Sequence, residues 1–320
     1  MPLYTAPEAD LSLTKSFDVW NRHNLVRIDN LANPGQPSAF ACEELSTLAD
    51  KIVQARQNGR PVIFLYGAHV VKCGLSRFLI QLIKRGIVTH VASNGAGSIH
   101  DFELAYLGGT SEHVPTAIED GSFGMWEQTG GWMNDAINAG AKLNLGYGRA
   151  LAQAIEDDPA RFPYREDCVF YQAYKNGVPA TYHITIGTDI IHQHPHADFG
   201  AIGAASGHDF AAFTQSVCDL DGGVYINMGS AVTGPEVFLK ALSIARNQGH
   251  RVADITTANF DIIDLGDYRS GISDKEPNYY YRPRKNVINR PVSLGGTGLY
   301  IRGNHMDTLP ALYNLLDGRL

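Results

Sequence analysis

Short apolar runs alternate with helical segments along most of the chain, and this alternation constrains the fold more than any other feature. Residues 61–66 form a continuous run, Pro-Val-Ile-Phe-Leu-Tyr, which indicates a strand covered on both faces. Further strands are expected at 88–92, 179–187, 223–228 and 252–257, and helices at about 43–56, 75–86, 209–220 and 235–247. We therefore predict an α/β fold: an open parallel sheet with helices on both faces and ligands at the carboxyl ends of its strands.

The chain is expected to consist of an N-terminal arm, residues 1–40, and a single α/β domain, residues 41–320. The arm contains four prolines and follows no strand or helix period, so we expect it to pack on a neighbouring subunit or on the domain surface. Of all residues, 44% are hydrophobic and 18% are charged, which excludes intrinsic disorder for the bulk of the chain.

Charge, hydropathy and cysteine content exclude several classes of protein. The net charge is −7 and no Lys/Arg cluster occurs, so no nucleic-acid partner is expected. No apolar run approaches the roughly 18 residues of a membrane span. The four cysteines lie far apart, without a C-x-x-C pair, which suits a reducing compartment. With no leader pattern at its start, the protein is expected to be cytoplasmic.

Two glycine-bearing loops follow expected strands. Gly67 opens the loop at 67–74, whose glycines let backbone N–H groups approach a phosphate and whose Lys72 adds a charge. The other interpretation of this loop is a tight turn with a solvated lysine. The second loop, Ser93-Asn94-Gly95-Ala96-Gly97, permits the same close approach of the backbone to a ligand.

Small residues also stand at the expected end of a later strand, where Thr257 and Ala258 occur. Several such junctions in one parallel sheet indicate a cleft of dinucleotide size. None of them carries the G-x-G-x-x-G fingerprint, and this argues against a standard Rossmann assignment.

His100 and Asp101 follow the second glycine loop, at the start of an expected helix. An imidazole and a carboxyl at this place form a candidate acid/base pair facing the cleft. In the alternative interpretation Asp101 caps the helix and His100 packs against neighbouring side chains.

A histidine-rich segment covers residues 183–198 and includes His192, His194 and Asp189. Imidazole and carboxylate are common metal ligands, but the spacing here is not diagnostic of a metal site. We predict no metal. Instead, His192 and His194 are expected to form a substrate wall that moves protons, with Asp189 holding one of them in its tautomer.

The assembled motifs resemble those of the deoxyhypusine synthase family. The resemblance covers about residues 41–316 and rests on four segments: Phe-Leu-Tyr-Gly at 64–67 through Cys-Gly-Leu at 73–75, the run 87–97 with His100-Asp101 after it, Ile-Thr-Thr-Ala-Asn-Phe-Asp at 255–261, and 299–306 through Pro310. It implies a deoxyhypusine synthase-like fold that binds NAD and a homotetramer with active sites at subunit interfaces. It further implies the oxidation of spermidine and the transfer of its aminobutyl group, through a lysine imine, to a lysine of a translation factor or to another polyamine.

Carried over by position, the resemblance assigns NAD contacts to the segment from Ser93 to Gly97 and to Thr257 and Ala258. One departure concerns the imine lysine, whose place reads Tyr300 in this chain, and no lysine follows Lys285. Tyrosine cannot form an imine. If the imine route persists, Lys72 is the candidate nucleophile, because the positive end of the helix expected near Gly74 would favour its neutral form. In the alternative, Lys72 contacts the cofactor's pyrophosphate.

Three functions are therefore open. The favoured hypothesis is an NAD-dependent transferase that acts on spermidine or a related amine. A second is a hydrolase or lyase that uses the histidine-rich cleft, with or without a metal, and a third is a non-catalytic nucleotide-binding protein. The number of titratable residues at strand ends favours an enzyme.

Overall fold

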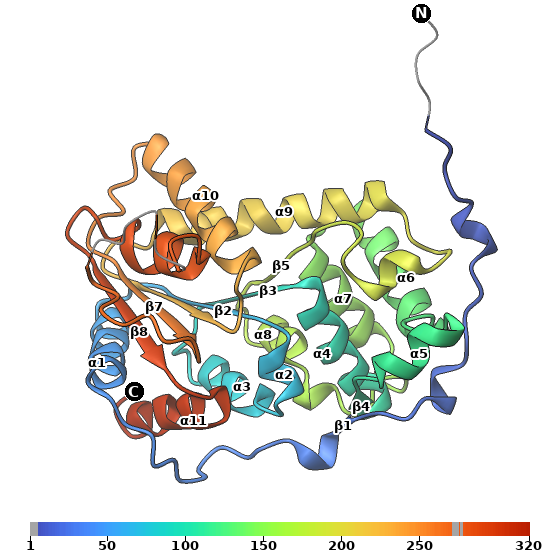
Figure 1. Ribbon diagram of the computed structural model, residues 1–320, viewed down its shortest axis with the longest axis horizontal. Coiled ribbons are helices and arrows are strands. Elements are labelled where there is room, and N and C mark those ends of the chain that lie inside the picture. The colour runs from blue at the N-terminus through green and yellow to red at the C-terminus, as the bar shows by residue number, and fades with distance from the viewer. Residues whose placement is uncertain (1–5, 271–274, 276–277) are drawn as a thin grey trace, which may run out of the picture.

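A single parallel sheet forms the centre of the computed structural model, which describes residues 6–270, 275 and 278–320 (Figure 1). Its six strands lie in the order β5-β3-β2-β6-β7-β8, and every neighbouring pair is parallel. They comprise β2 (Val62–Tyr66), β3 (His90–Asn94), β5 (Ala180–His183), β6 (Val224–Met228), β7 (Thr256–Asp261) and β8 (Thr297–Arg302). Helices cover both faces, so the predicted α/β class with an open parallel sheet is confirmed.

The strand order divides the sheet at β2 and β6. From β2 the chain moves outward through β3 to β5, then returns to place β6 on the other side of β2 and continues to β7 and β8. This is the order of the doubly wound dinucleotide-binding fold, in which ligands bind where the direction of winding reverses. The expectation against a standard Rossmann arrangement rested on the missing G-x-G-x-x-G fingerprint. The strand order of that arrangement is nevertheless present without the motif.

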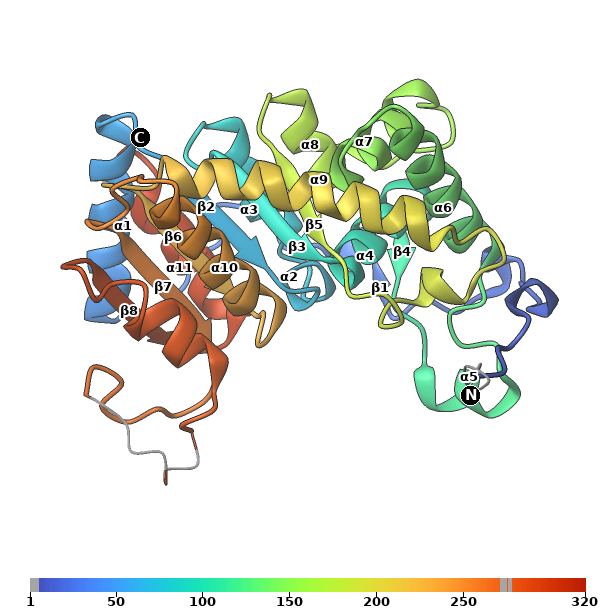
Figure 2. The same cartoon turned by 90° about the horizontal axis from the view of Figure 1, so that it is seen from above.

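Side chains of the central strands alternate between two hydrophobic clusters. Val62, Phe64 and Tyr66 of β2 point towards α1 (Glu43–Gln57), α3 (Ser76–Lys84) and α11 (His305–Leu316). Ile63 and Leu65 point to the other face, which α9 (Phe199–Cys218), α10 (Thr233–Asn247) and the helical turn Arg284–Asn289 cover (Figure 2). Fully burying one such side chain stabilises the fold by about 1.5–3 kcal/mol. These two layers fix the strand ends that carry the site.

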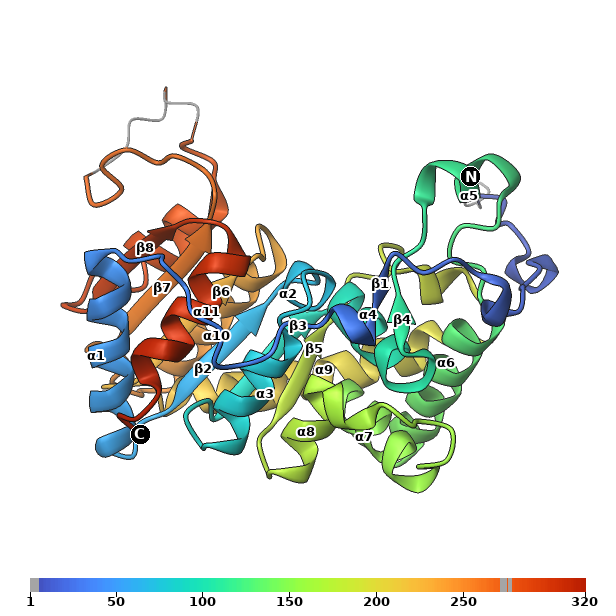
Figure 3. The ribbon, with the colours of Figure 1, turned by 90° about the horizontal axis from the view of Figure 1, so that it is seen from below.

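A helical region lies beyond the edge strand β5 and has a hydrophobic cluster of its own, which includes Phe102, Met133 and Leu151 (Figure 3). It consists of α4 (Gly95–Leu107), α5 (Val114–Asp120), α6 (Glu127–Lys142), α7 (Tyr147–Asp157) and α8 (Val169–Lys175). Across the described part of the chain, every helix is too short or too polar to span a bilayer.

The N-terminal arm runs along the surface of this same chain. Its short strand β1 (Val26–Arg27) pairs antiparallel with β4 (Gly109–Thr110), directly after α4. The arm also sends Arg22 into the helical region, where the guanidinium Nη1 lies 2.8 Å from Oε1 of the buried Glu103. The arm therefore contributes a charged side chain to the interior.

Candidate active site

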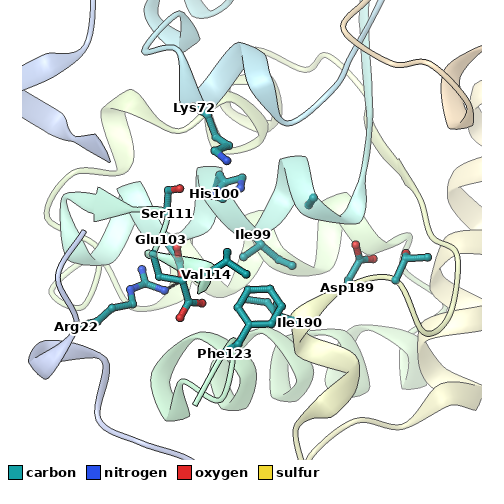
Figure 4. Close-up of a pocket in the computed structure, with 13 residues that line it drawn as sticks. Arg22, Lys72, Ile99, His100, Glu103, Ser111, Val114, Phe123, Asp189 and Ile190 are labelled. Carbon is teal, nitrogen blue, oxygen red and sulfur yellow. Dashed lines mark hydrogen bonds and ion pairs between the residues drawn. The ribbon is translucent and has the colours of Figure 1, made fainter. Parts of the chain in front are cut away.

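One face of α4 lines a cavity of about 230 Å³ near the carboxyl ends of β3 and β5. Ala96, Ile99, His100 and Glu103 recur at the three- and four-residue spacing that puts side chains on one side of a helix. Lys72 lies across from His100, and Asp189 closes the far end (Figure 4). The remaining lining residues are Arg22, Ser111, Glu112, Val114, Phe123, Thr188 and Ile190.

Glu103 is the centre of a buried hydrogen-bond network at one end of the cavity. Its carboxylate accepts from Arg22 at 2.8 Å, from the Thr129 hydroxyl at 2.8 Å and from the Thr110 hydroxyl at 2.5 Å. Burial alone would raise the pKa of Glu103, but the Arg22 guanidinium holds it below the ordinary value. Glu103 is therefore a charged, fully partnered anchor.

His100 is a neutral imidazole whose tautomer follows from this network. Its Nδ1 lies 2.7 Å from the Thr110 hydroxyl, which already donates its only proton to Glu103. The hydroxyl must therefore accept from His100, so the proton is on Nδ1 and the lone pair is on Nε2. Burial lowers the pKa of His100 to about 4. At neutral pH this ring is available as a hydrogen-bond acceptor.

Glu112 and Arg22 each leave one polar atom unsatisfied. Glu112 Oε1 accepts from the indole N–H of Trp126 at 2.9 Å and from the Gly124 amide at 3.1 Å, whereas Oε2 is buried without a partner among the described residues. Arg22 Nη2 is likewise buried without a partner. Burial raises the pKa of Glu112. Leaving such a group unpaired costs about 1–3 kcal/mol, which a bound ligand or water offsets.

Asp189 and His192 form a second pair of unsatisfied groups. His192 Nδ1 accepts from the backbone N–H of Gly187 at 3.0 Å and of Asp189 at 3.2 Å, so its proton is on Nε2. His192 Nε2 lies 3.9 Å from Asp189 Oδ2, and neither atom has a hydrogen-bond partner in the part of the chain that the structure describes. Burial raises the pKa of Asp189 to about 6 and lowers that of His192. Backbone amides, rather than the expected Asp189 carboxylate, therefore set the tautomer.

Asp101 does not face this cavity, contrary to the predicted acid/base pair with His100. Its fully buried carboxylate accepts from the backbone N–H groups of Val169 at 2.9 Å and Phe170 at 3.1 Å, at the start of α8. Successive residues of a helix point about 100° apart, which explains why neighbours in sequence serve different sites. Asp101 caps a helix, although of α8 and not of its own.

The histidine-rich segment is divided between separate places. His194 Nε2 lies 3.3 Å from Glu127 Oε2 of α6, and its ring packs against Gly130, away from the cavity-lining residues. His192 stands behind Asp189 and is not among the lining residues. Within residues 6–270, 275 and 278–320, no three His, Cys, Asp or Glu side chains gather closely enough to hold a metal ion.

The glycines predicted to contact NAD lie at the carboxyl edge of the sheet. Other protein atoms, however, occupy much of the space beside these glycines. A Cβ at Gly67 would clash with the Gly229 carbonyl across the point where winding reverses, and a Cβ at Gly95 would clash with the Asp189 carboxylate. Ser93 Oγ donates to the Tyr66 carbonyl at 2.6 Å. Such positions require glycine because the strands and loops approach each other there.

Asn94 acts as the cap of α4, since its side chain accepts from the Gly97 amide at 3.0 Å. A Cβ at Gly97 would also clash with the Ser93 hydroxyl. Of the segment 93–97, Ala96 is the residue that lines the cavity.

Thr257 and Ala258 are not at the carboxyl edge, which corrects their predicted placement. Both lie inside β7, opposite Tyr225 and Ile226 of β6, and both are fully buried. The Thr257 hydroxyl donates to the Val287 carbonyl at 2.6 Å. The strand begins four residues later than expected and ends at Asp261, so the carboxyl edge of β7 is at Asp261.

The carboxyl ends of β2 and β6, where the winding reverses, lie beside a residue that the sequence interpretation missed. His305, at the start of α11, stands over Gly229, and its Nδ1 is buried without a partner. Burial lowers the pKa of His305, and the charges of Asp261 and His69 act on it.

Arg22 and Glu112 were also missed, because no local motif marks either. Glu103 had a usable signal, since it follows His100 by three residues on an expected helix. Tyr300, at the family's lysine position, is buried in β8 and donates to the Ile263 carbonyl at 2.6 Å, as a structural residue would.

Comparison with known proteins relates the chain to others by fold. Neither a protein-family model nor a curated protein sequence matches it. A solved structure described as a conserved LOR/SDH protein from Methanococcus maripaludis S2 is 15% identical, with a TM-score of 0.50, and the match covers 89% of this chain and 73% of that one. At this identity the likeness shows a shared fold alone.

Two further similarities are weaker. The apo structure of ArgZ, an arginine dihydrolase of cyanobacteria, is 16% identical with a TM-score of 0.48; the match covers 87% of this chain, which spans about a third of that protein (33%). A structure described as a deoxyhypusine synthase from Entamoeba histolytica is 9% identical with a TM-score of 0.41, over 85% of this chain and 86% of that one. Membership of the deoxyhypusine synthase family stays a prediction.

Proposed function

We propose that this protein is an NAD-dependent enzyme that acts on a small amine. The observation that carries the proposal is a cavity with two buried, incompletely partnered carboxylates, Glu112 and Asp189, in a protein whose sheet has the strand order of a dinucleotide-binding fold. A carboxylate with one unpartnered oxygen suits an ammonium group. The cavity volume of about 230 Å³ suits a small metabolite rather than a macromolecular segment.

The residues at the carboxyl ends of β2 and β6 support the assignment of NAD. Gly67 and Gly229 bring β2 and β6 close together at the reversal point, and the His305 ring lies beside Gly229. Among the described residues its Nδ1 has no hydrogen-bond partner, so it is a polar group that a cofactor would satisfy. We assign the cofactor to Gly67 and to the Ser93–Gly97 segment at the neighbouring strand end. When bound, NAD would accept a hydride from the carbon that bears the amine.

The chain itself supplies the proton chemistry. An ammonium group must lose a proton before the C–H bond beside it gives up a hydride, and Asp189 is the acceptor we assign. With a pKa of about 6, its carboxylate is largely ionised at neutral pH and yet more basic than an ordinary aspartate. The neutral His100 orients the amine through Nε2, and the apolar wall of Ile99 and Phe123 excludes water.

The transferase step is the finer part of the proposal. Transfer of an aminobutyl group from spermidine would need an amine to hold it, and Lys72 is the lysine that lines the cavity. Lys72 is the last residue of the four-residue helix α2 (His69–Lys72), and α3 begins only at Ser76. Lys72 therefore lies outside the first turn of α3, the helix expected to activate it.

The test is a titration of NAD and NADH, followed by amine-dependent NAD reduction measured by nicotinamide absorbance. We expect binding without any amine and reduction only when a small amine is added. Absence of NAD and NADH binding at millimolar concentration would exclude the proposal. The control for variants of the site is Gly203→Ala, in the exposed part of α9, where an added Cβ meets open space.

A further inference from the structure

The two ends of the cavity differ in chemistry. At one end Arg22 Nη1 is bound to Glu103, whereas Arg22 Nη2 and Glu112 Oε2 are buried and have no partner within residues 6–270, 275 and 278–320. Trp126 holds the pair together, since its ring lies 5.4 Å from the guanidinium carbon of Arg22 and its indole N–H donates to Glu112 at 2.9 Å. An N–H donor and a carboxylate acceptor therefore lie near each other at this end.

One wall of the middle of the cavity is apolar, Lys72 and His100 line the same stretch, and the far end is acidic. Ile99, Val114, Phe123 and Ile190 lie between Arg22 at one side and Asp189 at the other (Figure 4). Asp189 brings a second carboxyl group whose Oδ2 is buried and unpartnered. The order along the cavity is thus a cation beside an anion, then hydrocarbon, then a second anion.

We propose that the ligand of this cavity is an α-amino acid with a second amine at the far end of an unbranched chain. This rests on the proposed function and names the class of its amine. The α-carboxylate meets the free Nη2 of Arg22, because a guanidinium presents N–H groups in the geometry that a carboxylate accepts. The α-ammonium meets Glu112, the methylene chain lies on the apolar wall, and the distal ammonium meets Asp189.

The charges of the wall support this class over a plain polyamine. Arg22 and Lys72 are cations, and Glu103, Glu112 and Asp189 are acids, which leaves one net negative charge when all three are ionised. A diamino acid carries two ammonium groups and one carboxylate, one net positive charge. A polyamine has no anionic group to meet Arg22, so its charges would be repelled by both cations of the wall.

The experiment compares ligands that differ only in the carboxylate: ornithine with putrescine, and lysine with cadaverine. Calorimetry on the full-length protein, with and without NAD, measures each affinity. We expect the diamino acid to bind at least tenfold more tightly than its diamine in at least one pair. Equal or tighter binding of both diamines, or no binding of either diamino acid, would overturn the inference.

A variant assigns the effect to Arg22. Arg22→Gln alone would strand the buried Glu103 charge, so the test variant is Arg22→Gln combined with Glu103→Gln, which keeps the pair neutral. Its selectivity ratio should fall to about one, whereas Arg27→Gln, an exposed arginine on the same arm, should keep the ratio of the unmodified protein. An unchanged ratio in the folded double variant would remove Arg22 from the site.

The outcomes separate this inference from the proposed function. NAD reduction driven by putrescine but not by ornithine would leave the proposed function standing and overturn the amino-acid class. Tight ornithine binding with no NAD binding would overturn the proposed function and leave the amino-acid class standing.

Discussion

Replacing Asp189 by asparagine should make the protein less active and, at neutral pH, more stable. Burial raises the pKa of Asp189 from 3.8 to about 6. The folded state therefore binds more protons than the unfolded state between these two values, and stability falls as pH rises through that window. A shift of about two pKa units corresponds to about 3 kcal/mol, so the charged form costs up to that amount above pH 6.

Asparagine removes this cost and keeps the shape of the side chain. It also serves equally well as an N-cap for the helical turn Ile190–Gln193, so the substitution tests the charge alone. Chemical denaturation should show a gain of up to about 3 kcal/mol at neutral pH, or about 5 °C in Tm for a chain of this size. Below about pH 4 the gain should vanish, because Asp189 is then protonated in both states.

Catalysis should respond in the opposite direction. Loss of a positioned proton acceptor lowers rates by about 10²–10⁴-fold, and kcat/KM of the unmodified protein should fall as pH drops through about 6. The variant should lack this limb of the pH profile. If Asp189→Asn is less stable at neutral pH, or differs equally at all pH values, Asp189 is a structural residue and the reasoning fails.

Three further changes test other parts of the site. Asp101→Ala leaves two buried N–H groups of α8 unpaired and should cost about 2–5 kcal/mol in urea unfolding, while NAD affinity of the folded variant stays within about twofold; a large loss of affinity would return Asp101 to the site. Gly67→Ala places a Cβ against the Gly229 carbonyl and should weaken NAD binding at least tenfold by calorimetry. The control Gly203→Ala, whose added Cβ contacts no atom, should raise stability by about 0.5–1 kcal/mol and leave NAD binding unchanged. Similar NAD affinities of the two variants would show that Gly67 does not contact the cofactor. Borohydride added with NAD and an amine should trap an adduct on Lys72 if the imine route operates, and the adduct should be lost in Lys72→Ala; trapping that persists in the variant would place the nucleophile elsewhere.

Much of the sheet could be predicted from the sequence because its strands are buried on both faces. A strand such as 62–66 has no polar face, and the unbroken apolar run makes it visible. The predicted position of β7 was wrong because this strand contains the polar Asn259, which interrupts its apolar run. That amide is tolerated in the interior because Asn227 of β6 donates to it at 2.6 Å, a partner that no sequence window includes.

The sequence by itself determined most of the central strands, their alternation with helices, and the glycine turns at the strand ends, because these depend on burial and on local backbone geometry. Only the tertiary structure decided the strand order and the membership of the cavity. Arg22 and Glu103 are 81 residues apart in the chain. Glu112 lies between β4 and α5, whereas Asp189 lies in the loop after β5. These residues come together because the arm crosses α4 and because the loop after β5 packs over the first turn of α4. Side chains separated by such distances along the chain share no periodicity, so pairing and packing, and not local pattern, bring them together.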